Sequence, residues 1–336
     1  MKKSLIIALG AIALVACTKT SVSYEQTGEI GFAPVVRKNS TKAAVEGTEF
    51  PEQNIKVFGY YDNSTGPGSS YADGNFAVEY LPGVEFAKNG DIWAGANNKH
   101  YYWPKTGSML FAGYSPVDFA GVTFNLASNT FSVAECPQPE FSATATKDLL
   151  YAGYGKSVLS GPVAMAFSHA LSWVTVKAKA ADVNQIKITN IKFVKLAEKG
   201  SSTGLPEWTT TGTKDITVFN PEAACKVPAR DTLVESYPNC GLVFPQTLTA
   251  DAKIVVSYEM NNGAGKWFAQ APFVAQLNLL TSNKGANKID KWEAGKHYTY
   301  IINFSAIGKP GSANEIKINP SITDWTPVDV DGISAN

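Results

Sequence analysis

The stretch Val163-Ala164-Met165-Ala166-Phe167-Ser168-His169-Ala170-Leu171-Ser172-Trp173 decides the fold class of this chain. Large apolar side chains occupy every second position except His169, and every residue between them is Ala or Ser. Successive side chains of a β-strand point to opposite faces, so a period of two predicts a strand with one buried face. His169 lies in the row of core residues, and we interpret it as a structural residue of the core or its boundary.

The same alternation recurs along the chain, in residues 186–188, 254–260 and 298–304 among others. No stretch of a dozen residues shows the 3.6-residue apolar period of a helix. Turn sequences such as Asn261-Asn262-Gly263 separate the alternating runs. Short strands between Gly, Pro and Asn turns predict an all-β fold of the sandwich type.

The length of the chain predicts two domains. Its 336 residues are too many for one sandwich and suit two in tandem. The polar stretch from Ala180 to Gln185 is the expected junction. We therefore predict an N-terminal sandwich over residues 51–180 and a C-terminal sandwich over residues 181–336.

Composition and charge limit the possible functions. The chain has 29 Lys and Arg residues, 29 Asp and Glu residues and only three His residues. Nucleic-acid affinity depends on neutralised phosphates, so a near-neutral chain is not expected to bind nucleic acid. The three His residues are scattered, and there is no Cys-x-x-Cys pair. We expect no catalytic residues, no metal, no cofactor and no enzymatic activity.

The first residues predict the compartment. Lys2 and Lys3 precede an apolar run over residues 5–15, which is shorter than the about 20 residues that span a bilayer. This is the pattern of a signal peptide over residues 1–16. Leu14-Val15-Ala16-Cys17 resembles a bacterial lipobox, which implies an acylated Cys17 anchored in membrane lipid. The alternative is an ordinary secretory signal with an incidental cysteine.

Three further cysteines follow, at positions 136, 225 and 240. Cys225 and Cys240 could form a disulfide around a small loop. The alternative is that all three are buried thiols.

Several segments, taken in chain order, resemble the fimbrillin-like family of Bacteroidia, which includes the type V pilins and their Mfa-like relatives. These segments are Asn39–Ala43, Ile55–Tyr60, Tyr101–Pro104, Leu110–Pro116, Asp148–Ala152, Met165–Leu171, Val243–Gln246, Ala294–Tyr300 and Ile322–Trp325. Each is weak alone. Their order and spacing over nearly the whole chain, behind a lipobox, make the resemblance specific.

The resemblance implies two transthyretin-like β-sandwich domains in a surface-exposed outer-membrane lipoprotein. It further implies that a trypsin-like protease cuts after a basic residue in the leader, which removes a leader strand and opens a groove in the N-terminal domain. A strand from another pilin subunit, of the same or a paralogous kind, would fill the groove. The implied function is that of a structural subunit of a type V pilus that supports adhesion.

Residues 17–50 are the leader in this scheme. Its one apolar patch supplies the candidate leader-strand residues Ile30, Phe32 and Val35. Arg37 follows the patch and is the expected processing site, with Lys42 as the alternative. The competing interpretation is that these basic residues only solubilise a tail.

The C-terminal segment from Glu315 to Ile333 is the candidate donor strand. Its apolar residues are Ile316, Ile318, Ile322, Trp325, Val328 and Val330. Pro320 and Pro327 interrupt it, and proline is disfavoured in a central strand. The alternative is that this segment is the last strand of its own domain.

The aromatic residues support a second hypothesis. Trp93, Tyr101, Tyr102, Trp103, Trp208 and Trp267 could form a stacking platform for sugars. The chain would then be a cell-surface glycan-binding lipoprotein. The alternative is that most of these rings pack in the two cores.

Overall fold

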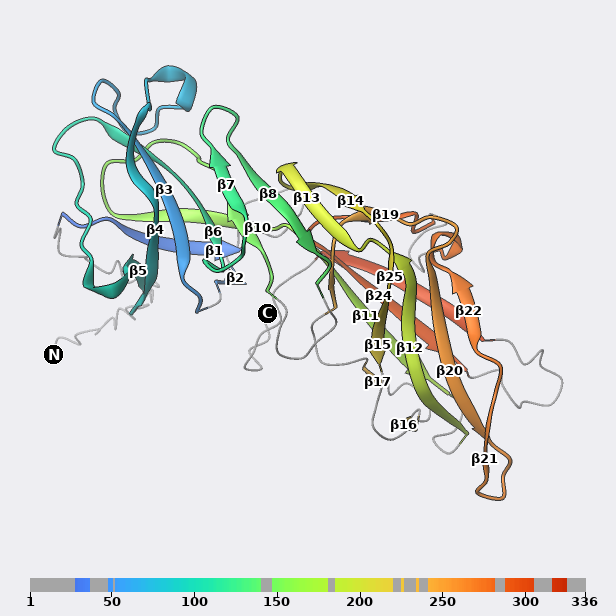
Figure 1. The fold of residues 1–336 in the computed structure, drawn as a ribbon. Helices are drawn as coiled ribbons and strands as arrows, with labels where there is room; N and C mark the ends of the chain where they lie inside the picture. Colours follow the sequence, from blue (N-terminus) through green and yellow to red (C-terminus); the bar gives the residue numbers. More distant parts are fainter. Residues whose placement is uncertain are drawn as a thin grey trace, which may run out of the picture.

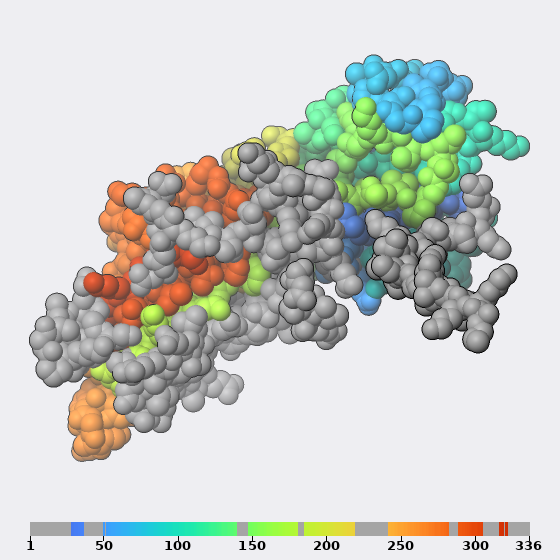
Figure 2. Space-filling model, turned by 180° about the vertical axis from the view of Figure 1, so that it is seen from behind, coloured from blue at the N-terminus to red at the C-terminus, as the bar shows by residue number. Residues whose placement is uncertain are grey.

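The fold is all-β, as the alternation predicts (Figure 1). The computed structural model describes residues 28–36, 48–50, 52–139, 147–180, 185–219, 225–226, 234–235, 241–281, 288–304 and 316–324. In these ranges the only helical elements are three short 3-10 turns, at Tyr71–Asp73, Ala96–Asn98 and Leu277–Leu279. The molecule is elongated, with one sandwich at each end, as the views from both sides show (Figures 1 and 2).

The N-terminal sandwich is built from one eight-stranded sheet that curls until it meets itself. Its strands are β1 (Gly31–Val36), β2 (Thr48–Glu49), β3 (Ile55–Asp62), β4 (Val78–Asn89), β5 (Ile92–Gly95), β6 (Ser108–Ser115), β9 (Leu150–Ala152) and β10 (Pro162–His169). The order is β10-β9-β6-β3-β4-β5-β1-β2, and β10 also pairs with β1. Strand β1 therefore closes a ring of strands around the N-terminal core.

The C-terminal sandwich has two facing sheets. One contains β11 (Ser172–Lys179), β17 (Val234–Glu235), β18 (Leu242–Val243), β24 (Lys296–Asn303) and β25 (Lys317–Asp324). The other contains β12 (Ile186–Leu196), β15 (Lys214–Phe219), β16 (Cys225–Lys226), β20 (Lys253–Asn261), β21 (Trp267–Ala269) and β22 (Phe273–Gln276). A two-stranded sheet, β19 (Gln246–Thr247) with β23 (Lys291–Trp292), lies beside them.

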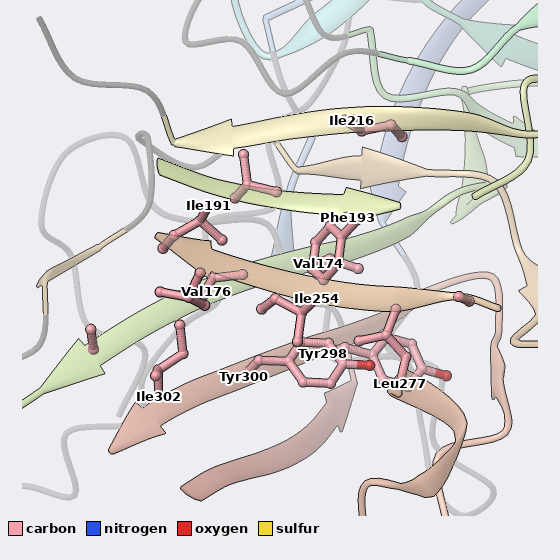
Figure 3. Packing of buried hydrophobic residues seen from close by; sticks show 14 of the residues in the cluster. Val174, Val176, Ile191, Phe193, Ile216, Ile254, Leu277, Tyr298, Tyr300 and Ile302 are labelled. Carbon is pink, nitrogen blue, oxygen red and sulfur yellow. The ribbon is translucent and has the colours of Figure 1, made fainter. Parts of the chain in front are cut away.

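The C-terminal core lies between these two sheets (Figure 3). Side chains of β11 and β24, such as Val176 and Tyr300, meet Phe193 of β12 and Ile254 of β20. The Tyr300 hydroxyl accepts a hydrogen bond from the indole nitrogen of Trp292 at 2.9 Å. Burial raises the pKa of Tyr300, and of its neighbour in the same strand, Tyr298, well above the usual range of a phenol.

A four-stranded sheet joins the two halves of the chain. Its order is β14 (Glu207–Thr211), β13 (Lys199–Gly204), β8 (Thr130–Pro137) and β7 (Val122–Asn125). Strands β7 and β8 come from the N-terminal half, and β13 and β14 come from the C-terminal half. Apolar residues from both halves, such as Tyr114, Phe131 and Leu205, pack together beneath this sheet. The connection between the sandwiches is therefore a packed structure of its own.

The alternating row from Val163 to Trp173 spans two strands that belong to different sheets. Strand β10 pairs with β9 and β1, and β11 pairs with β24, β17 and β18. The partners change across Ala170 and Leu171, although the alternation continues through both residues. The boundary at residues 180 and 181 stays a prediction. The pairing of β11 leads us to propose that the chain enters the C-terminal sandwich at Leu171.

Candidate assembly site around the leader strand

The leader segment, defined as residues 28–36, lies between two neighbours in the N-terminal sheet. On one side β1 runs parallel to β10 over its whole length, from Gly31 opposite Pro162 to Val36 opposite Phe167. On the other side, pairings with β5 and β2 are antiparallel. The backbone nitrogen of Ile30 donates to the carbonyl oxygen of Tyr101 at 2.7 Å. The segment is therefore hydrogen-bonded as an internal strand.

One face of the leader segment belongs to the N-terminal core. Ile30 is 2% exposed, and Phe32 and Val36 are 0% exposed. The ring of Phe32 contacts Phe86 and Phe111 edge to face, with centroid distances of 4.7 and 5.1 Å. Phe32 thus occupies the centre of an aromatic cluster, a geometry that contributes about 0.5–1.5 kcal/mol per pair beyond burial.

The structure differs from the sequence expectation at one leader position. Ile30 and Phe32 lie in the core, but Val35 is half-buried on the opposite face. Val36, which is not among the candidate leader-strand residues, takes the core position instead. The strict alternation Ile30, Phe32, Pro34, Val36 would have identified it, since side chains two residues apart share a face.

Pro34 lies inside this strand, where proline is unusual because it has no backbone N–H to donate. The partner of β1 on one side changes from Trp93 of β5, opposite Phe32, to Glu49 of β2, opposite Val35. Among the described residues, neither Ala33 nor Pro34 has an opposite residue on that side. Pro34 therefore lies where the neighbour of β1 changes from β5 to β2, a position that asks for no ladder partner on that side.

The predicted processing and lipidation residues lie outside the described residues. Arg37 follows Val36, the last residue of β1, directly in the sequence. Lys42 and Cys17 also lie outside the described ranges. All three assignments stay predictions.

The candidate donor strand forms part of the C-terminal sandwich. Strand β25 pairs with β24 along its length, from Lys317 opposite Asn303 to Asp324 opposite Lys296. It is the last strand of its sheet in the described chain, and Ile316 and Ile318 pack half-buried against the C-terminal core. Ile322 lies opposite Tyr298 in the same ladder. Trp325, Val328 and Val330 lie outside the described residues.

The three histidines occupy separate structural positions. The Nδ1 atom of His169 lies 2.7 Å from an oxygen of Asp148, next to the junction of the sandwiches. His100 pairs with Glu29 of the leader segment at 2.7 Å, on the surface. His297 stacks on the Trp173 ring with a centroid distance of 3.9 Å. In the described part of the chain, no group of three His, Cys, Asp or Glu residues could hold a metal ion.

One serine has a spacing known from hydrolases. Gly200-Ser201-Ser202-Thr203-Gly204 matches Gly-x-Ser-x-Gly, a motif that needs a strand-to-helix turn to expose its serine. Here the motif lies in strand β13, and Ser202 is buried. Its hydroxyl donates to the Glu207 carbonyl oxygen at 2.7 Å and accepts from the Gly204 nitrogen. Ser202 is therefore placed as a structural hydroxyl within its hairpin.

Among the cysteines, the structure describes the side chain of Cys136. Cys136 is a free thiol, and burial raises its pKa. The side chains of Cys225 and Cys240 lie outside the described part of the chain, so their pairing stays a prediction.

The aromatic residues do not gather into one platform. Trp93, Tyr101 and Trp103 pack in the N-terminal core, and Trp208 packs against the two clusters at the junction. Trp267 lies on β21 of the C-terminal sandwich, beneath the ammonium group of Lys187. Of the six residues, Tyr102 is exposed.

Comparison with known proteins agrees with this architecture. A sequence profile described as fimbrillin-like matches residues 41–325. The chain belongs to the fimbrillin-like family.

Solved structures share the fold of this fimbrillin-like chain. A candidate cell adhesion protein from Bacteroides ovatus is 16% identical, with a TM-score of 0.52 over 90% of this chain and 99% of that one. Another from Bacteroides uniformis is 17% identical, with a TM-score of 0.50 over 89% of this chain and 100% of that one. No curated protein matches the sequence.

Membership of the fimbrillin-like family makes the chain a fimbrial subunit at the cell surface or in a pilus, and implies assembly with other pilin subunits. In the part of the chain that the structure describes, no helix is long and apolar enough to cross a membrane.

Proposed function

We propose that this fimbrillin-like chain is a structural subunit of a type V pilus, activated by cleavage of its leader and assembled by strand exchange. The observation that carries the proposal is the position of β1. It is an internal strand with a buried aromatic residue, and the chain leaves it directly into Arg37. A cut after Arg37 would separate the leader segment from the rest of the chain as one unit.

Cleavage alone would not empty the groove. Ile30, Phe32 and Val36 are buried, and full burial of each such side chain contributes about 1.5–3 kcal/mol. The cut leader strand therefore stays bound until another strand with a similar apolar face replaces it. This favours exchange between subunits over simple release.

A vacated groove would need a new strand for two reasons. It would expose backbone groups of β10 and β5 that now pair with β1, and it would expose the pocket around Phe86 and Phe111. A strand donated by another subunit satisfies both needs. Contact between a groove on one subunit and a strand on the next is heterologous, so it propagates as a filament.

The remaining parts of the proposal rest on the sequence. Cys17 would carry the acyl chains that anchor the precursor in the bacterial outer membrane. A trypsin-like protease would cut after Arg37, with Lys42 as the alternative site. The C-terminal segment would supply the donor strand, and the partner would be a copy of this chain or a paralogous pilin.

Limited trypsin treatment of the lipid-free chain, with Cys17→Ala, tests the proposal. We expect mass spectrometry to map a cut after Arg37 and native gels to show a ladder of oligomers. Because Lys38 follows Arg37 and is itself a trypsin site, the test variant carries both Arg37→Gln and Lys38→Gln. It should move the cut to Lys42 or abolish it, and loss of the cut should abolish the ladder. A chain that has demonstrably lost its leader and still remains monomeric would contradict the proposed function.

A sugar-binding function has no structural support comparable to this. Trp93 is buried, and Tyr101, Trp103 and Trp208 pack half-buried against core or junction clusters, so these four rings do not form one exposed stacking platform.

A further inference from the structure

We propose that residues 316–322 of a second copy enter the groove in one register, in which Pro320 takes the place of Pro34. This inference rests on the proposed function and deepens it, because it assigns each donor residue to a position in the groove. It also limits the donor strand to the first half of the predicted C-terminal segment.

The two segments share a seven-residue pattern. The leader reads Ile30-Gly31-Phe32-Ala33-Pro34-Val35-Val36, and the C-terminal strand reads Ile316-Lys317-Ile318-Asn319-Pro320-Ser321-Ile322. Each has large apolar residues at its first, third and seventh positions and proline at its fifth. In both segments the described residues of this row face a core. Ile30, Phe32 and Val36 belong to the N-terminal core, and Ile316 and Ile318 pack against the C-terminal core. The prolines of the two rows, Pro34 and Pro320, are both buried.

The proline makes the correspondence specific. A strand inserted between two neighbours normally donates an N–H at every residue, and proline cannot. In the groove, proline is tolerated where the neighbour changes from β5 to β2. A donor shifted by one residue would turn its apolar row away from the core. A donor shifted by two residues would move Pro320 away from this position.

The same spacing occurs once more in the chain, at Val78–Val84, but that segment is a poor donor. It lies in β4, an internal strand of its sheet, in which residues 78–84 pair with β3 and the following residues 86–89 pair with β5. Its Val78 and Tyr80 are exposed instead of facing a core. Strand β25, in contrast, has a single neighbour among the described strands, so its release breaks one ladder.

The connection before β25 is long enough for release. Asn303 of β24 lies opposite Lys317 of β25, although residues 304–316 separate them in the sequence. A β-hairpin needs two to five connecting residues. Thirteen residues reach about 43 Å when extended at about 3.3 Å each, so β25 can leave its sheet while β24 stays in place.

The donor fits the groove less well than the leader at two positions. Ile318 would replace Phe32 and lose its two edge-to-face contacts. Lys317 would replace Gly31, where an added Cβ atom would come within 3.1 Å of the end of the Ile92 side chain. The leader therefore competes successfully with the donor while it is covalently attached, which explains why a cut would have to precede exchange.

Disulfide cross-linking of the full chain tests the register. Opposite β10, the leader places Ala33 against Ala164, so the proposal places Asn319 of one copy against Ala164 of the next. Trypsin-treated chains that carry Asn319→Cys and Ala164→Cys should form disulfide-linked oligomers under mild oxidation, since paired strand residues lie within disulfide reach. The matched control carries Asn319→Cys and Ala166→Cys, a pair offset by two residues. Each single variant controls for the native cysteines.

The outcomes separate the two proposals. Cross-linking at least tenfold more efficient for the 319–164 pair than for the control supports the register. Oligomers that cross-link equally or only through the 319–166 pair overturn the register and leave the proposed function intact. A disulfide formed within one chain would show that the chain's own C-terminal strand occupies the groove, and would overturn the proposal that a second copy does. The absence of any oligomer after confirmed cleavage overturns the proposed function, and this inference with it.

A second measurement needs no change in the folded chain. Synthetic peptides of residues 315–324 should inhibit ladder formation when added in excess. A peptide with Pro320 exchanged with Ser321 keeps its composition and should inhibit on the order of tenfold less. A peptide with Lys317→Gly and Ile318→Phe should inhibit on the order of tenfold better, because it regains the leader's fit. Equal inhibition by all three peptides would contradict the assignment of Pro320.

Discussion

The leader strand β1 and the last strand β25 share a sequence pattern but are held differently. Strand β1 closes the N-terminal sheet, with neighbours on both sides and Phe32 at the centre of an aromatic cluster. Strand β25 lies at the edge of its sheet, with one neighbour in the described chain and half-buried isoleucines. The same pattern thus occurs in β1, which two neighbouring strands hold, and in β25, which one neighbouring strand holds. We therefore expect β1 to be harder to remove than β25. The difference lies in the surrounding sheet.

The largest expected effect tests how firmly β1 is held. Phe32→Ala should lower the free energy of unfolding of the uncut chain by about 3–5 kcal/mol, because it removes a fully buried ring. Urea denaturation followed by tryptophan fluorescence would measure this change. Val35→Ala in the same strand is the matched control and should cost less than half as much, since Val35 is half-buried. Equal costs would mean that β1 is not anchored by its core face.

High pH should weaken the region that contains β25 more than the region that contains β1. Burial raises the pKa values of Tyr298 and Tyr300 in the folded chain, whereas an unfolded tyrosine ionises near pH 10. Above pH 10 the unfolded state therefore binds fewer protons, and the free energy of unfolding falls as pH rises. Each tyrosine should contribute a loss of about 1.4 kcal/mol per pH unit.

Urea denaturation at pH 9 and pH 11 would measure this loss. Tyr300→Phe should make stability less dependent on pH, although it also removes the acceptor for the Trp292 indole. Tyr114→Phe is the control in the N-terminal half, where burial also raises the pKa of the phenol but to a smaller extent. If both variants change the pH dependence of stability equally, the prediction that high pH weakens the β25 region more than the β1 region is wrong.

The smallest expected effect concerns β25 itself. Ile318→Ala should lower the free energy of unfolding by about 1–2 kcal/mol, below the range of about 2–5 kcal/mol for a fully buried isoleucine, because the side chain is half-buried in an edge strand. Thermal unfolding of the uncut chain would measure it. A cost as large as that of Phe32→Ala would show that β25 is held as firmly as β1, and that the proposed donor is not easily released.

The sequence predicted the strands of this fold better than their partners. The alternation from Val163 to Phe167 identified the core face of β10 correctly, but in β11 the residues that face the C-terminal core are Val174, Val176 and Ala178, which have the opposite parity. Alternation also carries no information about which strand lies alongside. It therefore did not reveal that the strand partners change between His169 of β10 and Ser172 of β11. The pairing of β8 with β13 joins residues more than 60 positions apart, and neither segment contains a feature that specifies the other.

The candidate site shows the same limit. The patch that contains Ile30 and Phe32 was recognisable because it is the one apolar run in a polar leader. Because Val35 and Val36 are both apolar, hydrophobicity alone does not choose between them. Alternation from Ile30 and Phe32 favours Val36, and Val36 is buried opposite Phe167 of β10. The equivalence of Pro34 and Pro320 became meaningful once the structure showed where the groove accepts a proline.

The sheet shared by the two halves has a mechanical consequence for a fibre built from such subunits. Bending one subunit at its waist would have to break the ladder between β8 and β13 and pull apart the cluster around Phe131 and Leu205. Each subunit would therefore resist bending at this junction. A fibre of such subunits would bend mainly at the contacts between subunits. Its flexural rigidity would then depend on how strongly the groove of one subunit binds the short strand exchanged from the next.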